Sequence, residues 1–111
     1  MSDKITVIQE LKQLVVDFVE ARDWIQFHTP KNLSMSIAIE AAELMELFQW
    51  FDGLRLEKEH LDRVREELAD VVIYCLSMAN ATGIDLSDAV RNKVKDNENK
   101  YPVKLFKGRY K

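Results

Sequence analysis

The sequence predicts an all-α fold, with about four helices in a bundle that oligomerisation completes. Three glycines and two prolines in 111 residues are less than half of their usual combined share of about 12%. So few turn-forming residues cannot supply the turns that a β-sandwich, a barrel or a Rossmann sheet requires. Apolar residues instead recur every three or four positions along most of the chain, which is the period of an amphipathic helix. The length allows a single domain, residues 1–111.

Charge, hydropathy and cysteine content exclude several classes of protein. Sixteen lysines and arginines against 19 aspartates and glutamates give a net charge of −3, so no basic surface indicates a nucleic-acid polymer as partner. The chain shows neither a signal-type apolar core near Met1 nor an uncharged stretch of 18 residues, so we expect a cytoplasmic protein with no membrane contact. The single cysteine, Cys75, excludes an intramolecular disulfide and a cysteine zinc cluster.

The first two helices are predicted over residues 3–22 and 33–51. The first alternates apolar and charged residues at helical spacing. Thr29-Pro30 disfavours helix at Thr29, so Asn32 or Ser34 is expected to cap the second helix, which should stop at Asp52-Gly53. The second helix is apolar on nearly every face, so other helices must surround it.

The third helix is predicted over residues 57–82 and the fourth from Asp85 to about Lys100. The third is charged in its first turns and apolar afterwards, and Thr82-Gly83 is a typical C-terminal stop. Asp85 is expected to cap the fourth helix, and the basic tail, about 103–111, is expected to be irregular. Four helices of this length cannot bury the second helix together with the apolar end of the third, so we expect a homo-oligomer.

Two pairs of carboxylates stand where apolar residues would be expected. Glu40 and Glu43 interrupt the most apolar helix, and Glu67 and Asp70 precede the apolar half of the next one. A spacing of three residues places each pair on one helix face. The two pairs face each other if these helices pack antiparallel.

Four converging carboxylates repel one another unless a cation compensates them, since each buried charge costs several kcal/mol. Four oxygen ligands without His or Cys favour Mg²⁺, with Mn²⁺ as a possible substitute. A single Glu-x-x-Glu is usually only a solvated rim, and it is the duplication that favours a metal site. A di-iron bundle needs two Glu-x-x-His motifs; only Glu57 and His60 fit, at a polar helix start.

Several segments together resemble the MazG-like all-α nucleoside triphosphate pyrophosphohydrolases, in particular the dCTP pyrophosphatase branch. The resemblance covers about residues 5–102 and includes the two carboxylate pairs. The matching segments run from Arg22 to His28, Pro30 to Leu33, Glu40 to Leu44, Phe48 to Trp50, Glu66 to Val71 and Lys100 to Pro102.

This resemblance implies Mg²⁺-dependent hydrolysis of a (deoxy)nucleoside triphosphate, dCTP or a modified dCTP, to the monophosphate and pyrophosphate. It also implies a tetramer rather than a dimer. The metal ligands and catalytic residues carried over are Glu40, Glu43, Glu67 and Asp70; one of them could orient or deprotonate the water, and the sequence does not say which.

Further residues are predicted to contact the nucleotide. The resemblance implies Trp24 and Trp50 as stacking walls for the base, with His28 nearby, although both tryptophans could instead be core residues. Tyr74 follows Asp70 by four residues and shares its helix face. The remaining three match the family's Lys-x-x-x-Asn-x-x-x-Tyr spacing and are Lys93, Asn97 and Tyr101.

Two other functions stay open at this point. The same fold could act on dUTP or another non-canonical nucleotide. Alternatively, the chain could be a non-catalytic helical interaction module whose carboxylates bind a structural cation.

Overall fold

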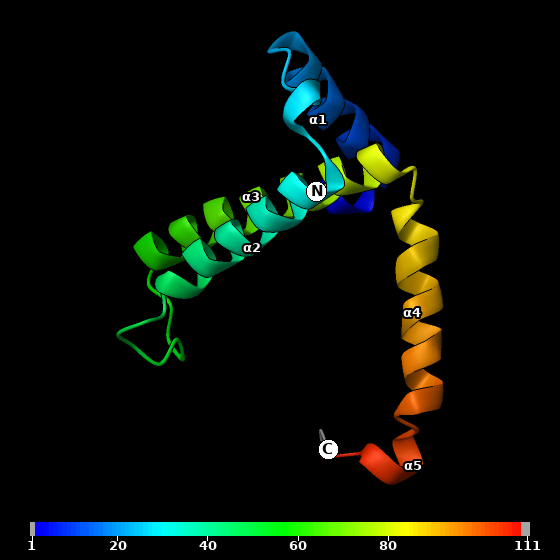
Figure 1. The fold of residues 1–111 in the computed structure, drawn as a ribbon. Helices are drawn as coiled ribbons and strands as arrows, with labels where there is room; N and C mark the ends of the chain where they lie inside the picture. Colours follow the sequence, from blue (N-terminus) through cyan, green and yellow to red (C-terminus); the bar gives the residue numbers. More distant parts are fainter. Residues whose placement is uncertain (1, 110–111) are drawn as a thin grey trace.

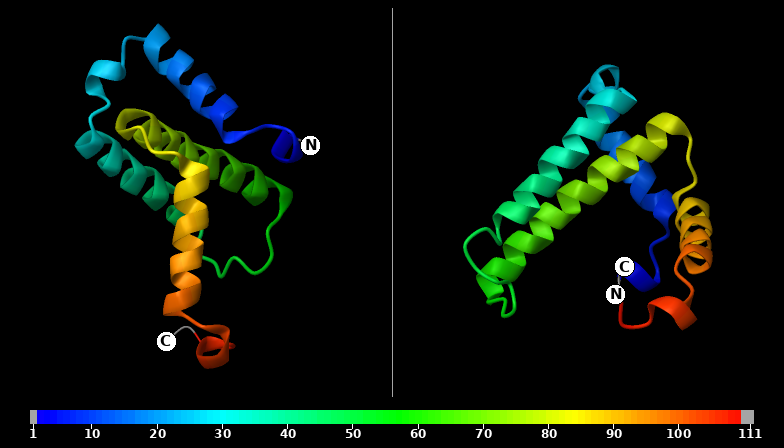
Figure 2. Two further views of the ribbon diagram at one scale, coloured as in Figure 1. Left: turned by 90° about the vertical axis from the view of Figure 1, so that its right-hand side faces the viewer. Right: turned by 60° about the horizontal axis from the view of Figure 1, so that its bottom comes forward.

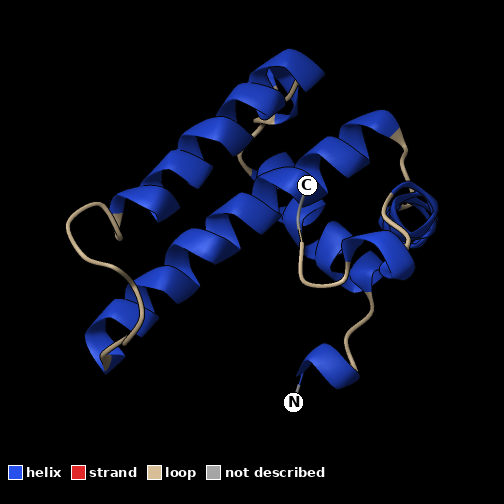
Figure 3. Ribbon diagram, turned by 90° about the horizontal axis from the view of Figure 1, so that it is seen from below, coloured by secondary structure: helices blue, strands red, loops and turns tan. Residues whose placement is uncertain are grey.

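A computed structural model describes residues 2–109, and every regular element in that range is helical (Figure 1; Figure 3). The all-α class is therefore confirmed. The elements are two short 3₁₀ helices and five α-helices: η1 Ser2–Lys4, α1 Ile8–Ala21, η2 Ile25–Phe27, α2 Pro30–Glu46, α3 Lys58–Thr82, α4 Leu86–Lys100 and α5 Val103–Phe106.

The first α-helix begins later than predicted. Residues 2–4 form a separate turn, in which the amides of Ile5 and Thr6 donate to the Ser2 carbonyl (2.9 and 2.6 Å). Val7 is extended (φ −89°, ψ 157°) and α1 starts at Ile8. The prediction of one helix from residue 3 is wrong, because the β-branched pair Thr6-Val7 favours extended backbone at that point.

The second helix begins earlier and ends earlier than predicted. The Thr29 side chain accepts a hydrogen bond from the Asn32 amide (3.2 Å), and Pro30 occupies the first turn. Asn32 and Ser34 are therefore not caps; proline fits the first helical position because no partner is needed there for its missing N–H. After Glu46 the backbone continues as turns, with Phe48 N–H donating to the Met45 carbonyl (3.0 Å), so the helix does not reach residue 51.

The antiparallel hairpin of α2 and α3 is the main packing unit of the chain (Figure 1; Figure 2). It confirms the predicted pairing of these two helices. α3 ends at Gly83, whose left-handed conformation (φ 70°) terminates the helix as the sequence indicated. α1 packs on the C-terminal half of α3 through the small core of Val15, Val19 and Leu76.

The fourth helix leaves the hairpin instead of lying along it. Asp85 caps α4 as predicted, accepting from the Asp88 amide (2.9 Å). α4 then runs away from α2 and α3 (Figure 1; Figure 2), and none of its residues is buried. α5 corrects the expectation of an irregular tail, because the Phe106 ring packs edge-on against Tyr101 (5.2 Å between centroids). Residues 110 and 111 of the predicted tail lie outside the described range.

The isolated chain exposes far more surface than a compact domain of its mass. Its accessible surface is 9370 Å², whereas a compact 13.0 kDa monomer exposes about 6,300 Å². The radius of gyration is 16.9 Å, against about 13 Å for a compact domain of this length. Among the described residues, no helix is both long enough and apolar enough to cross a membrane.

Candidate metal centre and nucleotide site

The α2–α3 hairpin brings the four predicted metal ligands together. Each of them contributes a carboxylate oxygen to a group in which all the oxygens lie within 4.8 Å of one another. Glu40 and Glu43 come from α2, and Glu67 and Asp70 come from α3. The three-residue spacing aims each pair from one helix face, and the antiparallel packing places the two faces opposite each other.

The cluster is electrostatically strained because carboxylates surround one another. The pKa of Glu40 is raised to about 7, first by its hydrogen bond with Glu43, then by burial, and then by repulsion from the other three carboxylates. Burial raises the pKa of Glu67 as well, and repulsion from Glu43 adds to that rise. Proximity of like charges and removal from water both disfavour the ionised form of a carboxyl group.

The described residues offer these carboxylates too few partners. The buried Oε2 atoms of Glu40 and Glu67 have no hydrogen-bond partner in residues 2–109. The ion pairs of α3 lie in its first turns, where Asp62 binds Lys58 (3.0 Å) and Arg65 (2.7 Å). A compact set of oxygen donors without a cationic partner fits a hard divalent cation such as Mg²⁺.

Two predicted nucleotide contacts lie next to each other, one turn beyond the cluster. Tyr74 follows Asp70 by one turn of α3 and is half-buried. The His28 ring, at the end of η2, lies against it with 6.5 Å between ring centroids and a tilt of 46°. The structure thus places His28, in the segment just before α2, against the face of α3 that carries Glu67 and Asp70.

The two tryptophans do not meet within one chain. Trp24 precedes η2 and contacts Phe18 edge-on (5.8 Å between centroids), whereas Trp50 follows α2 and is 88% exposed. α2, which has 17 residues and is about 25 Å long, lies between Trp24 and Trp50 in the chain. A base held between both rings would need one tryptophan from each of two chains, so this sandwich stays a prediction.

The predicted contacts on α4 are also separated from the cluster in a single chain. Lys93 and Asn97 lie on α4 and Tyr101 follows it. Their four-residue spacing places all three on one side of that helix. Because α4 runs away from the hairpin (Figure 1), the structure does not bring these three residues to the acidic cluster of the same chain.

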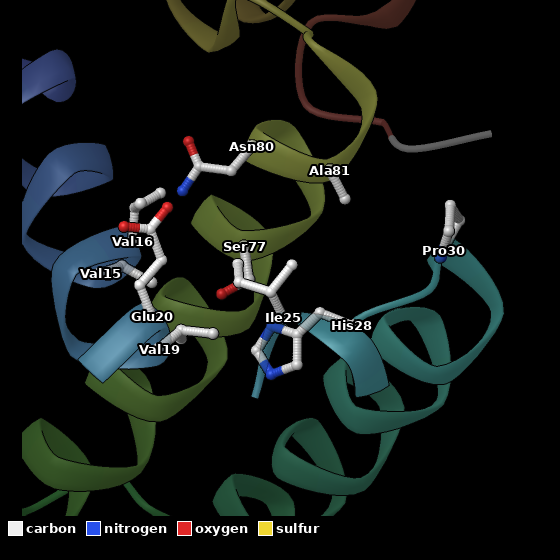
Figure 4. A pocket seen from close by; sticks show the side chains of 10 residues that line it. All are labelled: Val15, Val16, Val19, Glu20, Ile25, His28, Pro30, Ser77, Asn80 and Ala81. Atoms are coloured by element: carbon white, nitrogen blue, oxygen red, sulfur yellow. The ribbon is translucent and has the colours of Figure 1, made fainter. Parts of the chain in front are cut away.

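A pocket that the sequence did not indicate opens at the C-terminal half of α3, between α1, η2 and the start of α2 (Figure 4). Its volume is about 390 Å³, and its polar lining includes Glu20, His28, Ser77 and Asn80. His28 alone was predicted. The available signal was Ser77, a hydroxyl within the apolar run of α3 that follows Tyr74 by three residues and so shares its face.

Comparisons with known proteins support the resemblance found in the sequence. The dCTP pyrophosphatase 1 of Rattus norvegicus is 36% identical over 106 residues, which cover 91% of this chain and 62% of that protein. The dCTP pyrophosphatase 1 of Homo sapiens is 39% identical over 103 residues, covering 88% of this chain and 61% of that protein. This chain therefore spans about three-fifths of the length of these relatives.

A solved structure and a family model agree with these relatives. The crystal structure of a pyrophosphatase from Archaeoglobus fulgidus DSM 4304 is 44% identical, with a TM-score of 0.76; the match covers 85% of this chain and 91% of that one. The model of the MazG-like family matches residues 35–111, which is more than half of the chain. The chain belongs to the MazG-like family.

Proposed function

We propose that this chain is a cytoplasmic Mg²⁺-dependent enzyme that hydrolyses a nucleoside triphosphate to the monophosphate and pyrophosphate. One observation carries the proposal: four carboxylates from two helices converge within 4.8 Å, and within residues 2–109 the salt bridges of α3 involve Asp62 and none of these four. The pyrophosphatase names of the relatives support the same reaction.

The carboxylates Glu40, Glu43, Glu67 and Asp70 would hold the cation. Mg²⁺, or Mn²⁺ in its place, supplies charge compensation for the triphosphate and lowers the pKa of bound water. The chain itself provides an open, largely acidic surface that repels a triphosphate without metal. Phosphate binding therefore depends on the cation, and one of the four carboxylates orients or deprotonates the attacking water.

The proposed substrate is dCTP or a modified dCTP. His28 and Tyr74 lie one turn from the acidic cluster, where they can contact the sugar or the base. Trp24 and Trp50 provide exposed indole faces, and stacking on such a face contributes roughly 1 to 3 kcal/mol per base. Hydrolysis of dUTP or another non-canonical nucleotide on the same fold is the alternative substrate assignment.

The active form is proposed to be a homo-oligomer, a tetramer rather than a dimer. A groove of about 500 Å³ between α1 and α3 is lined only by apolar side chains, among them Leu14, Val72 and Ile73. Apolar side chains of α4 are open as well, with Val90 58% and Val94 52% exposed. A second copy that covers these faces would remove the excess accessible surface.

The same assembly would complete the nucleotide site. In one chain α4 leaves the hairpin, so the Lys93, Asn97 and Tyr101 side of one copy would approach the acidic cluster of its neighbour. Lys93 at that place would compensate negative charge of the triphosphate, whereas the carboxylates alone would repel it.

A triphosphate screen tests the reaction. Purified chain with Mg²⁺ and each common nucleoside or deoxynucleoside triphosphate should release pyrophosphate and not orthophosphate, with dCTP among the best substrates. In ¹⁸O-labelled water the label should enter the nucleoside monophosphate, because water attacks the α-phosphoryl group, and never free orthophosphate. Diphosphate with orthophosphate as main products would contradict the proposal, and no hydrolysis of any triphosphate would favour the non-catalytic interaction module.

A further inference from the structure

One arginine of α3 lies on the same helical stripe as the acidic cluster. The stripe has four-, three- and four-residue spacing and consists of Arg63, Glu67, Asp70 and Tyr74. Such spacing places all of them on one side of the helix. Tyr74 stands at the end of the stripe that the His28 ring contacts. Arg63 stands at the opposite end, one turn before Glu67 and towards the loop between α2 and α3.

The guanidinium group of Arg63 is available to a ligand. Arg63 is exposed, and it takes part in no hydrogen bond or ion pair among residues 2–109. The two other basic residues of α3 are engaged, because Lys58 and Arg65 both bind Asp62. In the described range, Arg63 is therefore the basic residue of α3 that has no carboxylate partner.

The α2–α3 hairpin has no second basic side chain beside the cluster. α2 carries one lysine, Lys31 in its first turn, and α3 carries no lysine or arginine after Arg65. A triphosphate brings several negative charges, of which the two outer phosphates hold most. An arginine suits them, because its planar guanidinium donates two parallel hydrogen bonds to phosphate oxygens.

The position of Arg63 matches the two outer phosphates of the substrate. The α-phosphate joins the nucleoside to these phosphates, so a substrate with its nucleoside at Tyr74 and its α-phosphate at the cluster directs them towards Arg63. From Glu67 back to Arg63 the helix rises only about 6 Å, which a long arginine side chain can cover. Beyond Arg63 the ring of His60 packs on Phe51 (4.7 Å between centroids), so the loop after α2 folds onto this end of the stripe.

We propose that Arg63 binds the pyrophosphate half of the triphosphate and stabilises it as the leaving group. This inference rests on the proposed function. The oxygen of a water molecule forms a bond to the α-phosphorus, and the bond from that phosphorus to the α,β-bridging oxygen breaks. The electron pair of the broken bond leaves with pyrophosphate, and a proton of the water passes to the cluster or to solvent. The Arg63 guanidinium offsets the negative charge that develops on the leaving group.

Three variants of the full chain with Mg²⁺ test this role. Arg63→Ala should lower kcat for dCTP by about 10- to 100-fold, the effect of a lost charge-assisted hydrogen bond. Arg63→Lys should recover part of the loss, because it keeps the charge and not the paired donors. Arg65→Ala is the matched control: Arg65 lies on another face of α3 and binds Asp62 at the surface, so kcat should stay nearly unchanged.

The dependence on the leaving group separates a direct contact from a structural effect. Analogues of dCTP with CF₂ or CH₂ in place of the β,γ-bridging oxygen release leaving groups of lower and higher basicity. Without the guanidinium the developing charge is less compensated, so single-turnover rates should differ more between the two analogues in Arg63→Ala than in wild type. The same ratio of rates in both proteins would show that Arg63 does not contact the leaving group.

A calorimetric titration provides a test that needs no hydrolysis. Pyrophosphate and deoxycytidine monophosphate, the two products, are titrated separately into the chain with Mg²⁺. Arg63→Ala should weaken pyrophosphate binding by about 10-fold and leave the affinity for the monophosphate unchanged. Unchanged pyrophosphate binding would overturn the assignment, and so would an equal loss of affinity for both products, because a structural change would affect the whole site.

The inference and the proposed function fail in different ways. If wild type hydrolyses triphosphates and Arg63→Ala behaves like Arg65→Ala, the assignment of Arg63 is wrong and the proposed function stands. If wild type hydrolyses no triphosphate, the proposed function is wrong. The pyrophosphate titration then decides by itself whether Arg63 binds this anion.

Discussion

Glu40 shows how one residue of the acidic cluster ties protonation to stability. Its pKa in the folded chain is about 7, against an ordinary value of 4.5, because Glu43 shares a hydrogen bond with it, burial removes it from water and like charges surround it. The folded chain therefore binds the Glu40 proton more tightly than the unfolded chain does. As the pH rises from about 4.5 to about 7, the unfolded chain has already released this proton, and the folded chain must release it from a site that holds it more tightly. Deprotonation of Glu40 therefore lowers the stability of the folded state.

The metal-free protein should accordingly lose stability as the pH rises from about 4.5 to about 7. The melting temperature in chelator, measured in steps across this range, should fall more for wild type than for Glu40→Gln, which carries no titrating group there. The stabilisation by Mg²⁺ should grow over the same range, since bound carboxylates must be deprotonated. Parallel curves for wild type and Glu40→Gln would exclude the raised pKa as the cause.

Glu43 and Asp70 distinguish a metal site from a structural network. In a metal site without metal the carboxylates repel one another, so Glu43→Gln and Asp70→Asn should melt at or above the wild-type temperature in chelator. Both should lose activity and most of the thermal shift on adding Mg²⁺. A structural network would instead lose roughly 3 to 5 kcal/mol when one partner is removed. Lower melting in chelator, with an equal Mg²⁺ shift in all three proteins, would therefore rule out the metal site.

At the scale of the element, the first turn of α2 sets the position of the carboxylates. Thr29 caps the helix and Pro30 begins it, while the Asn32 side chain donates back to the Phe27 carbonyl (3.0 Å). These contacts fix where the helix starts and so which residues face α3. They also hold His28, which directly precedes the cap, at the rim of the pocket.

Thr29→Ala should lower the free energy of unfolding by about 1 kcal/mol, because the Asn32 amide then has no side-chain acceptor. Chemical denaturation of the Mg²⁺-free protein measures this loss. Ser34→Ala is the informative comparison: its hydroxyl donates to the Lys31 carbonyl inside the helix, so it should cost much less. If Thr29→Ala and Ser34→Ala lost the same free energy of unfolding, the result would contradict Thr29 as the cap and would favour Ser34, which the sequence suggested.

The helices and the acidic cluster could be predicted from the sequence because both depend on local periodicity. Glu40 and Glu43 share a face in any α-helix, and so do Glu67 and Asp70. The end of α2 could not be predicted, since Leu47 and Phe48 continue the apolar pattern although their backbone forms turns. The pocket around Ser77 also escaped prediction, because it depends on how α1 and η2 cross α3, which no spacing along one helix specifies.

For the whole molecule, a large apolar surface is the main feature to explain. Leu86, Val90 and Val94 recur at four-residue spacing and form an apolar stripe along α4. Leu86 packs on the core, but the other two remain exposed in one chain. Periodicity identifies an apolar face and does not say whether the same chain or another one covers it.

Light scattering after size exclusion should give a dimer or a tetramer at micromolar concentration. Val72→Glu places a charge in the groove between α1 and α3 and should shift the protein toward monomers. Leu54→Glu, in the exposed loop between α2 and α3, should leave the assembly intact. A wild-type monomer of 13.0 kDa would contradict the proposed assembly.

Mixed subunits test whether two chains share one site. Glu43→Gln and Lys93→Ala should each be weakly active alone. If α4 of one chain serves the cluster of another, their co-refolded mixture should recover about one quarter of wild-type activity, since half of random pairs are mixed and each holds one intact site. A mixture no more active than the average of its parents would show that α4 of one chain does not serve the cluster of another.

A cation bound by both α2 and α3 would also restrain the loop that joins these two helices. Glu43 stands near the end of α2 and Glu67 near the start of α3's apolar half, so a cation bound by both helices closes the chain between them much as a covalent cross-link would. Such a closure reduces the conformational entropy of the unfolded loop more than that of the folded loop, so it stabilises the folded state. Mg²⁺ should therefore slow amide hydrogen exchange most strongly in residues 40–70, and the metal-free chain should be most open to proteolytic cleavage at the tip of this hairpin.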